Sequence, residues 1–411
     1  MSAVIINAPR YYTDDGWPAV TATITIGSRR HNVIFRASQG PLRQDAAPFA
    51  ILALFPAMTL GVPLRVTTPI PSALRDHLHE TQDVILSDLP NMHRVAIEAQ
   101  VMADAPTDSA RGVACFFSGG VDSTYTLLKH QAEIDHLIFV HGFDVPLTNK
   151  RLRETVTSAI HREATEFGKP VIEVETNARD FISPYLKDWV WGIGPSAAAV
   201  AYLLSPFLHT VYMASGLDYG IQPHANMYRQ WYQLFSTPLL QISDDGREAM
   251  RFQKVALLTQ NETAMRWLRV CYENPHNAYN CGHCAKCLQT MLSLKLVDAL
   301  DKCQTFPHTI DLAAVRRATP QGGELVFTMQ AMIAAVKLGT HPDIVAALSD
   351  CLGVAPTTTP DHTAIELAIA RRRVNILRGQ LEQATNSYSW RLTAPLRALG
   401  SGVRALRRMT R

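Results

Sequence analysis

The chain has 411 residues, of which 47% are hydrophobic and 18% charged, and its net charge is +3. Such a length exceeds one hydrophobic core, so we expect two or three domains, and the apolar content excludes a disordered chain. Ten arginines and one acid lie in residues 371–411, which leaves 29 basic and 35 acidic residues elsewhere. The chain therefore lacks a strong nucleic-acid-binding signal outside its basic end.

The N-terminal residues lack the charged start and apolar run of a signal peptide, so we expect a cytoplasmic protein. Seven cysteines, four of them within residues 271–287, fit reduced thiols and a metal better than a disulfide framework. Two apolar stretches, residues 49–64 and 196–214, contain prolines. We expect both to be buried within the fold rather than to span a membrane.

Alternating apolar residues at positions 22–26 and 32–35 indicate strands, and helix-like sequence and a strand near residues 95–99 follow. Residues 1–110 are therefore predicted to form an α+β domain. Residues 103–108 have the composition of a linker.

Residues 111–305 alternate apolar strands with helical segments, the strands being expected at residues 113–117, 137–140, 171–174 and 211–215. This pattern is typical of an α/β, Rossmann-like domain in which helices cover both faces of a parallel sheet. Ligands bind such sheets at the carboxyl ends of the strands. A helix is expected at residues 288–300. A helical extension at 306–355 and a basic helical tail at 356–411 are expected to follow.

The sequence Ser-Gly-Gly-Val-Asp-Ser occupies residues 118–123, between the first of these strands and a helix. Gly119 and Gly120 allow the main chain to approach an anion, while the following helix offers its positive end. The hydroxyl groups of Ser118 and Ser123 add donors. These features predict a phosphate-binding loop, including Val121 and Asp122, although it lacks the lysine of a Walker A motif.

This loop resembles the signature of the N-type ATP pyrophosphatases, the PP-loop superfamily. The resemblance implies an adenine nucleotide alpha hydrolase-like fold, in which the loop binds the pyrophosphate that leaves when ATP adenylates a substrate. It also implies that residues after the second strand, His141, Gly142 and Asp144, approach the adenosine. An ordinary connecting turn is the competing interpretation of these three residues.

Further site residues are proposed from position and chemistry. Asp122 and Asp144 offer the hard oxygen ligands that Mg²⁺ prefers. Ser215 begins the segment 215–218, which lies at a predicted strand end where ligands bind, and an ordinary turn is the alternative. Arg251 and Lys254 lie three residues apart on one helix face and could stabilise charge on the phosphates, so they and Asp122 are our candidate catalytic residues. A solvated helix face is the alternative for Arg251 and Lys254.

Four cysteines with the spacing C-x9-C-x2-C-x2-C predict a structural Zn²⁺ site, since four thiolates leave no open coordination position. His283 is an alternative fourth ligand, and a redox or sulfur-carrying Cys-x-x-Cys is the competing interpretation. The predicted ligands are Cys271, Cys281, Cys284 and Cys287.

The phosphate loop followed by this cluster resembles the 7-cyano-7-deazaguanine synthase family over residues 112–300. The resemblance implies ATP-dependent adenylation of a carboxylate and attack by ammonia. Because this chain carries about 110 residues before the loop and more than 100 after the cysteines, we expect a related ligase with another carboxylate or carbonyl substrate.

The C-terminal residues 386–397 are similar to a segment found in many enzymes of bacterial surface-polysaccharide synthesis. Apolar residues among arginines there could contact an anionic membrane surface or a partner. A homo-oligomer is also compatible with the sequence.

The sequence thus predicts an AMP-forming ligase that uses ATP, Mg²⁺ and Zn²⁺ with a small-molecule acceptor and an ammonia or amine donor. A tRNA-thiolating PP-loop enzyme and a non-catalytic nucleotide-binding module are the alternatives.

Overall fold

A computed structural model describes residues 3–354 except 104–110, 187, 217–230, 319, 321 and 322, together with residues 367 and 374. The chain forms two compact units, Met1–Ile310 and Asp311–Arg411. All predicted nucleotide and metal ligands lie in the first unit.

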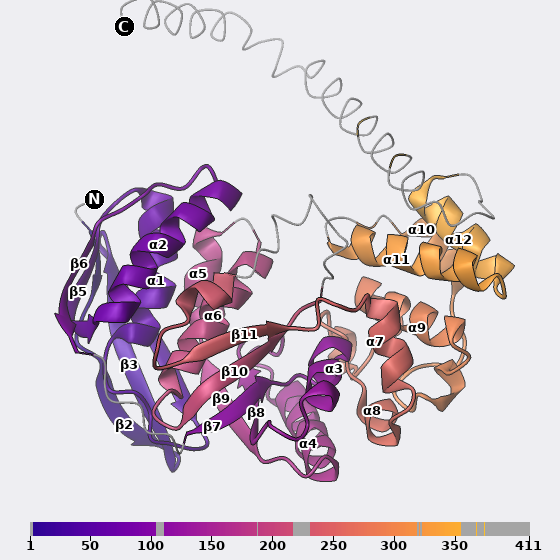
Figure 1. Ribbon diagram of the computed structural model, residues 1–411, viewed down its shortest axis with the longest axis horizontal. Helices are drawn as coiled ribbons and strands as arrows, with labels where there is room; N and C mark the ends of the chain where they lie inside the picture. The colour runs from indigo at the N-terminus through magenta and orange to yellow at the C-terminus, as the bar shows by residue number, and fades with distance from the viewer. Residues whose placement is uncertain are drawn as a thin grey trace, which may run out of the picture. The chain divides into compact units, whose positions relative to one another are not determined.

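The first unit is an α/β structure built on one mixed sheet of eleven strands among the described residues (Figure 1). The strand order is β11-β10-β7-β8-β9-β4-β3-β1-β5-β6, and β2 pairs with β3 outside this path. The strands are β1 (Val4–Ile6), β2 (Arg10–Asp14), β3 (Trp17–Ile26), β4 (Arg29–Ala37), β5 (Leu64–Pro71), β6 (Ile97–Met102), β7 (Gly112–Phe116), β8 (His136–His141), β9 (Val171–Thr176), β10 (Leu208–Ala214) and β11 (Gln241–Asp245).

Five of these strands form a parallel region in the order β11-β10-β7-β8-β9, and all but β11 were predicted. The chain passes from β7 to β8 and β9 on one side and then returns to β10 and β11 on the other. The order therefore reverses between β7 and β10, and a crevice for a ligand opens at the carboxyl ends of the strands at such a point.

The sheet is mixed rather than parallel throughout, because β4 pairs antiparallel with β9, with Phe35 opposite Thr176. Through this pairing the strands of the expected N-terminal α+β domain extend the parallel region. The sheet thus continues across the expected boundary at residue 110, and both parts lie in the unit Met1–Ile310.

Helices cover both faces of the parallel region, as predicted, and alternate residues of β8 show why. Leu137 and Phe139 pack into a core with α4, whereas Ile138 and Val140 face a core that includes α1 and α6. In Figure 1, α1, α2, α5 and α6 accordingly lie on one side of the sheet and α3 and α4 on the other. The helices of this unit are α1 (Ala47–Leu60), α2 (Ser72–Asp88), α3 (Val121–Lys129), α4 (Lys150–Glu166), α5 (Ala178–Ile182), α6 (Val190–Leu203), α7 (Arg251–Leu258), α8 (Glu262–Trp267) and α9 (Ala285–Leu296).

The two apolar stretches are buried as expected, the first mainly in α1 and the second in α6 and β10. Among the described residues, no helix combines the length and apolar character that crossing a membrane requires.

The second unit contains α10 (Leu312–Arg317), α11 (Gly323–Leu338) and α12 (Pro342–Leu352), in agreement with the predicted helical extension. Arg316 and Asp350 form an ion pair of 3.2 Å between α10 and α12. The basic tail predicted at 356–411, apart from residues 367 and 374, lies outside the described residues.

Candidate functional site

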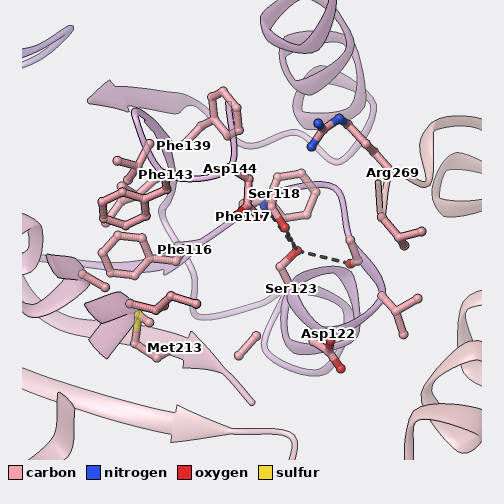
Figure 2. A pocket seen from close by; sticks show the side chains of 18 of the residues that line it. Phe116, Phe117, Ser118, Asp122, Ser123, Phe139, Phe143, Asp144, Met213 and Arg269 are labelled. Atoms are coloured by element: carbon pink, nitrogen blue, oxygen red, sulfur yellow. Dashed lines mark hydrogen bonds between the residues drawn. The ribbon is translucent and has the colours of Figure 1, made fainter. Parts of the chain in front are cut away.

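The predicted phosphate loop connects β7 to α3, and its two serines fix its shape (Figure 2). The Ser123 hydroxyl donates to the Gly120 carbonyl at 3.2 Å and accepts from the Ser118 amide at 3.2 Å. The two serine hydroxyls lie 3.3 Å apart. The Ser123 side chain therefore links the main chain at the start of the turn to the main chain at its end.

This turn presents main-chain donors. Gly119 has φ +68°, a conformation that favours glycine, and no side chain caps the start of α3 at Gly120. In the part of the chain that the structure describes, no acceptor bonds the amides of Gly119, Gly120, Val121 or Asp122. Consecutive amides at a helix N-terminus bind anions, so the loop has the donors that a phosphate requires.

Asp122, where the loop enters the first turn of α3, holds two cations from α7. Arg251 Nη1 is 2.7 Å from one carboxylate oxygen of Asp122, and Lys254 Nζ is 3.1 Å from the other. Burial opposes ionisation of Asp122, but these cations outweigh it and lower its pKa. Arg251 is 5% exposed and Lys254 is fully buried, so the alternative of a solvated helix face is wrong.

A pocket opens at the point where the strand order reverses, and its two ends differ in chemistry. Aromatic and apolar side chains from β7, β8, β10 and the loop after β8 line one end, and polar residues of the phosphate loop line the other (Figure 2). Phe116, Phe139, Phe143 and Met213 lie toward the apolar end in Figure 2, and Ser118, Asp122 and Ser123 toward the polar end. Asp144, Arg251, Arg269 and Lys286 also line the pocket.

Among the residues predicted after β8, Asp144 lines the pocket and His141 does not. His141 is buried on the α4 side of the sheet, where its Nε2 lies 2.9 Å from Glu173. Gly142 has φ +96°, and a β-carbon there would lie 1.9 Å from the Thr176 carbonyl oxygen. Only a residue without a β-carbon fits so close to the main chain of Thr176, so packing alone explains Gly142 and no ligand contact is needed.

Ser215 follows β10 and contributes through its main chain. Its carbonyl oxygen accepts a hydrogen bond from Lys254 Nζ, and its amide donates to the Asp245 carbonyl at 2.8 Å. Ala214 lines the pocket immediately before it. Ser215 thus helps to position Lys254. The neighbouring residues 217 and 218, which also belong to the predicted strand end, lie outside the described residues.

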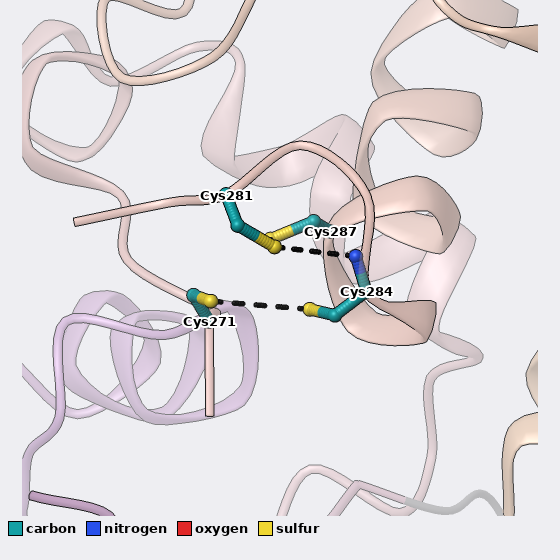
Figure 3. Close-up of side chains that lie close together, drawn as sticks. All are labelled: Cys271, Cys281, Cys284 and Cys287. Carbon is teal, nitrogen blue, oxygen red and sulfur yellow. Dashed lines mark hydrogen bonds between the residues drawn. The ribbon is translucent and has the colours of Figure 1, made fainter. Parts of the chain in front are cut away.

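The four predicted cysteines come together, and their side chains point toward one another (Figure 3). Their sulfur atoms all lie within 4.8 Å of one another, with Cys281 to Cys287 at 3.8 Å and Cys271 to Cys284 at 3.9 Å. Tetrahedral Zn²⁺ with Zn–S bonds of about 2.3 Å places its sulfurs about 3.8 Å apart. The cluster is therefore close enough to hold a metal ion and has a geometry compatible with zinc.

The surroundings of the cluster also suit thiolates. The amides of His283 and Cys284 donate to Cys281 Sγ at 3.4 and 3.2 Å. The imidazole of His283 is not part of the cluster. Burial raises the pKa of the Cys281 thiol, so a bound cation would be needed to stabilise four adjacent thiolates.

No family model matches this chain, and no curated protein or solved structure is significantly similar to it. What the site can bind is therefore inferred from its own hydrogen-bond donors and charges. Among the residues that line the pocket, these are the amides of Gly120, Val121 and Asp122, the guanidinium of Arg251 and the carboxylate of Asp144.

Two cations of the pocket were missed by sequence reasoning. Arg269, 4% exposed, precedes Cys271 by two residues, and its Nη2 donates to Asn274 at 2.6 Å. Lys286 lies between the last two cysteines, and its charge helps to lower the pKa of Asp122. Both belong to residues 269–287, the cysteine segment. The spacing of its cysteines predicted a metal site, but it did not indicate that this segment also lines the pocket.

Proposed function

We propose that this chain is an ATP-dependent ligase of the PP-loop type, which forms AMP and pyrophosphate while activating a carboxylate or carbonyl substrate. The observation that carries the proposal is the row of amides from Gly119 to Asp122, which have no hydrogen-bond partner among the described residues and lie beside buried cations. In this proposal the amides and the hydroxyl of Ser118 bind the two terminal phosphates. The fold around the loop is then Rossmann-like.

The balance of charge supports an anionic ligand. Arg251, Lys254 and Lys286 act on the single carboxylate of Asp122, so this side of the pocket carries an excess of positive charge. Such an excess stabilises the negative charge that develops on pyrophosphate as it leaves. Asp122 keeps the cations in place. If Asp122 bound a metal ion, it would lose its ion pairs with Arg251 and Lys254.

Both Asp122 and Asp144 line the pocket, but Asp144 fits Mg²⁺ better, because its carboxylate carries no side-chain hydrogen bond in the described part of the chain whereas that of Asp122 holds two cations. Mg²⁺ bound there would neutralise charge on the triphosphate. The apolar end of the pocket, with Phe116, Phe139 and Phe143, would accommodate the planar base.

The proposed reaction has two steps. An oxygen of the acceptor attacks the α-phosphorus of ATP, the bond to the β-phosphate oxygen breaks, and pyrophosphate leaves toward the loop. Ammonia or an amine then attacks the activated carbon, loses a proton, and displaces AMP. The cysteine cluster takes no part in either step, since four sulfur ligands leave zinc no position for a substrate.

The test is to incubate the full chain with ATP, Mg²⁺ and a panel of carboxylates plus ammonium, and to identify the nucleotide product. AMP with pyrophosphate supports the ligase, and ADP with phosphate contradicts it. Stimulation by tRNA with a sulfur donor would favour the thiolating enzyme instead. Tight nucleotide binding without turnover would favour a binding module. Lys254→Met should abolish turnover, whereas the exposed Lys150→Met on α4 should not.

A cytoplasmic location, contact of the basic tail with a membrane or partner, homo-oligomerisation and a role in surface-polysaccharide or secondary biosynthesis belong to the same proposal. They rest on the sequence features described above.

A further inference from the structure

A buried acid lies next to the phosphate loop. Glu163, in the last turn of α4, is fully buried. Neither of its carboxyl oxygens has a hydrogen-bond partner in the described part of the chain. Burying an unpaired carboxylate costs far more free energy than burying a neutral carboxylic acid, so this environment favours the protonated form.

The neighbour of this acid is Gly119. A β-carbon built on Gly119 would lie 2.9 Å from Glu163 Oε2 and 3.3 Å from Ile160 Cδ1. The carboxyl group therefore packs against the main chain of the loop, next to the amides that face the pocket. A negative charge at this position would repel a phosphate bound to those amides.

Among the residues that the structure describes, none forms an ion pair with Glu163. Burial raises the pKa of Glu163 well above its ordinary value, and Glu166 on the same helix raises it further. Glu166 itself pairs with Arg266 of α8 at 3.0 Å. From the cysteine segment, Arg269 directs its guanidinium to Asn274, and Tyr279 donates its hydroxyl to the Trp267 carbonyl.

We infer that Glu163 is a positioning residue that supports the phosphate loop only as a neutral acid, and that loss of its proton to solvent weakens anion binding. This inference rests on the proposed function of the loop and adds a protonation requirement to it. Because a bound phosphate disfavours a second negative charge nearby, nucleotide should in turn hold the proton on Glu163 more tightly.

The experiment measures the affinity of the full chain for ATP, and separately for inorganic pyrophosphate, as the pH is raised from neutral to alkaline. For the wild type we expect affinity to fall on the order of tenfold as Glu163 ionises. Glu163→Gln should bind as the wild type does at neutral pH and should lack this alkaline loss. Glu154→Gln, an exposed position of the same helix, is the matched control and should keep the wild-type profile.

Infrared spectroscopy provides a second readout that does not depend on the variant folding. The wild type should show a protonated-carboxyl band at neutral pH that disappears over the range in which affinity falls. The inference is overturned if the wild type binds both ligands while Glu163→Gln shows the same alkaline loss, or if that band is absent. Binding of neither ligand at any pH would instead overturn the proposed function, and this inference with it.

Discussion

The main-chain amide of Arg269 donates a hydrogen bond of 2.8 Å to the carbonyl oxygen of Gly119. This bond joins the segment that enters the cysteine cluster to the phosphate loop, since Cys271 follows only two residues later. The same segment supplies Arg269, Val270 and Cys271 to the wall of the pocket. A metal ion that orders the cysteine segment should therefore also order the phosphate loop.

Loss of the metal is predicted to weaken nucleotide binding. Cys284→Ser should lower zinc content and raise the Kd for ATP at least about tenfold, because the loop loses its support. Zinc analysis and calorimetric titration measure the two effects. Cys303→Ala changes a buried cysteine outside the cluster and should affect neither. Full zinc content in Cys284→Ser would contradict the assignment of this ligand.

Asp122 is predicted to be important for stability as well as activity. Asp122→Asn removes the counter-charge of Arg251 and Lys254, and we expect it to lower the free energy of unfolding by about 3 kcal/mol. Urea unfolding measures this loss. Adding Lys254→Met should recover part of it, because one unpaired buried cation is then gone. Strictly additive losses in the double variant would show that the ion pair is not the cause.

The two loop glycines should differ in their tolerance of a side chain. Gly119→Ala meets both a left-handed main-chain conformation and the carboxyl group of Glu163 at 2.9 Å, so we expect nucleotide binding to be lost. Gly120 has φ −88°, and its nearest contacts to an added β-carbon are 3.2 and 3.3 Å. Gly120→Ala should therefore be the milder change. Comparable ATP affinity in Gly119→Ala and the wild type would refute this view of the loop.

Glu173 is predicted to make stability depend on pH. Burial opposes its ionisation, but hydrogen bonds from His141 and His161 outweigh this and lower its pKa to about 2. A lowered folded-state pKa gives stability that is present above the unfolded pKa and is lost as the pH falls toward about 2.

Glu173→Gln should thus be less stable than the wild type by about 2 kcal/mol at neutral pH, with a difference that shrinks below about pH 4.5. Urea unfolding at several pH values tests this. Glu98→Gln is the control, because its ion pair with Arg65 is exposed and should contribute little. A difference that grew on acidification would contradict the predicted sign.

Much of the fold and site followed from local sequence. The four strands expected in the parallel region appear as β7, β8, β9 and β10, with ends shifted by up to three residues. The turn between β7 and α3 and the proximity of the four cysteines were also predicted, because each is defined by residues close together in the chain. The pairing of Phe35 with Thr176 was not, since no local pattern records a contact between residues so far apart.

The direction of single side chains was harder to predict. Leu137, Phe139 and His141 alternate along β8, yet Phe139 lines the pocket whereas His141 contacts Glu173 and Thr157 and does not. Alternation along a strand places these three residues on one face of the sheet, but it does not show which of them reaches the ligand-binding edge. Arg269 and Lys286 were missed because an isolated cation carries no spacing signal of its own.

The most direct test of the central claim is a crystal structure of the full chain with Mg²⁺ and an ATP analogue whose α–β bridge cannot be cleaved. Our account predicts that the β- and γ-phosphates bind the amides from Gly119 to Asp122, with the α-phosphorus open toward the rest of the pocket. An analogue bound elsewhere, with those amides facing no phosphate, would contradict it.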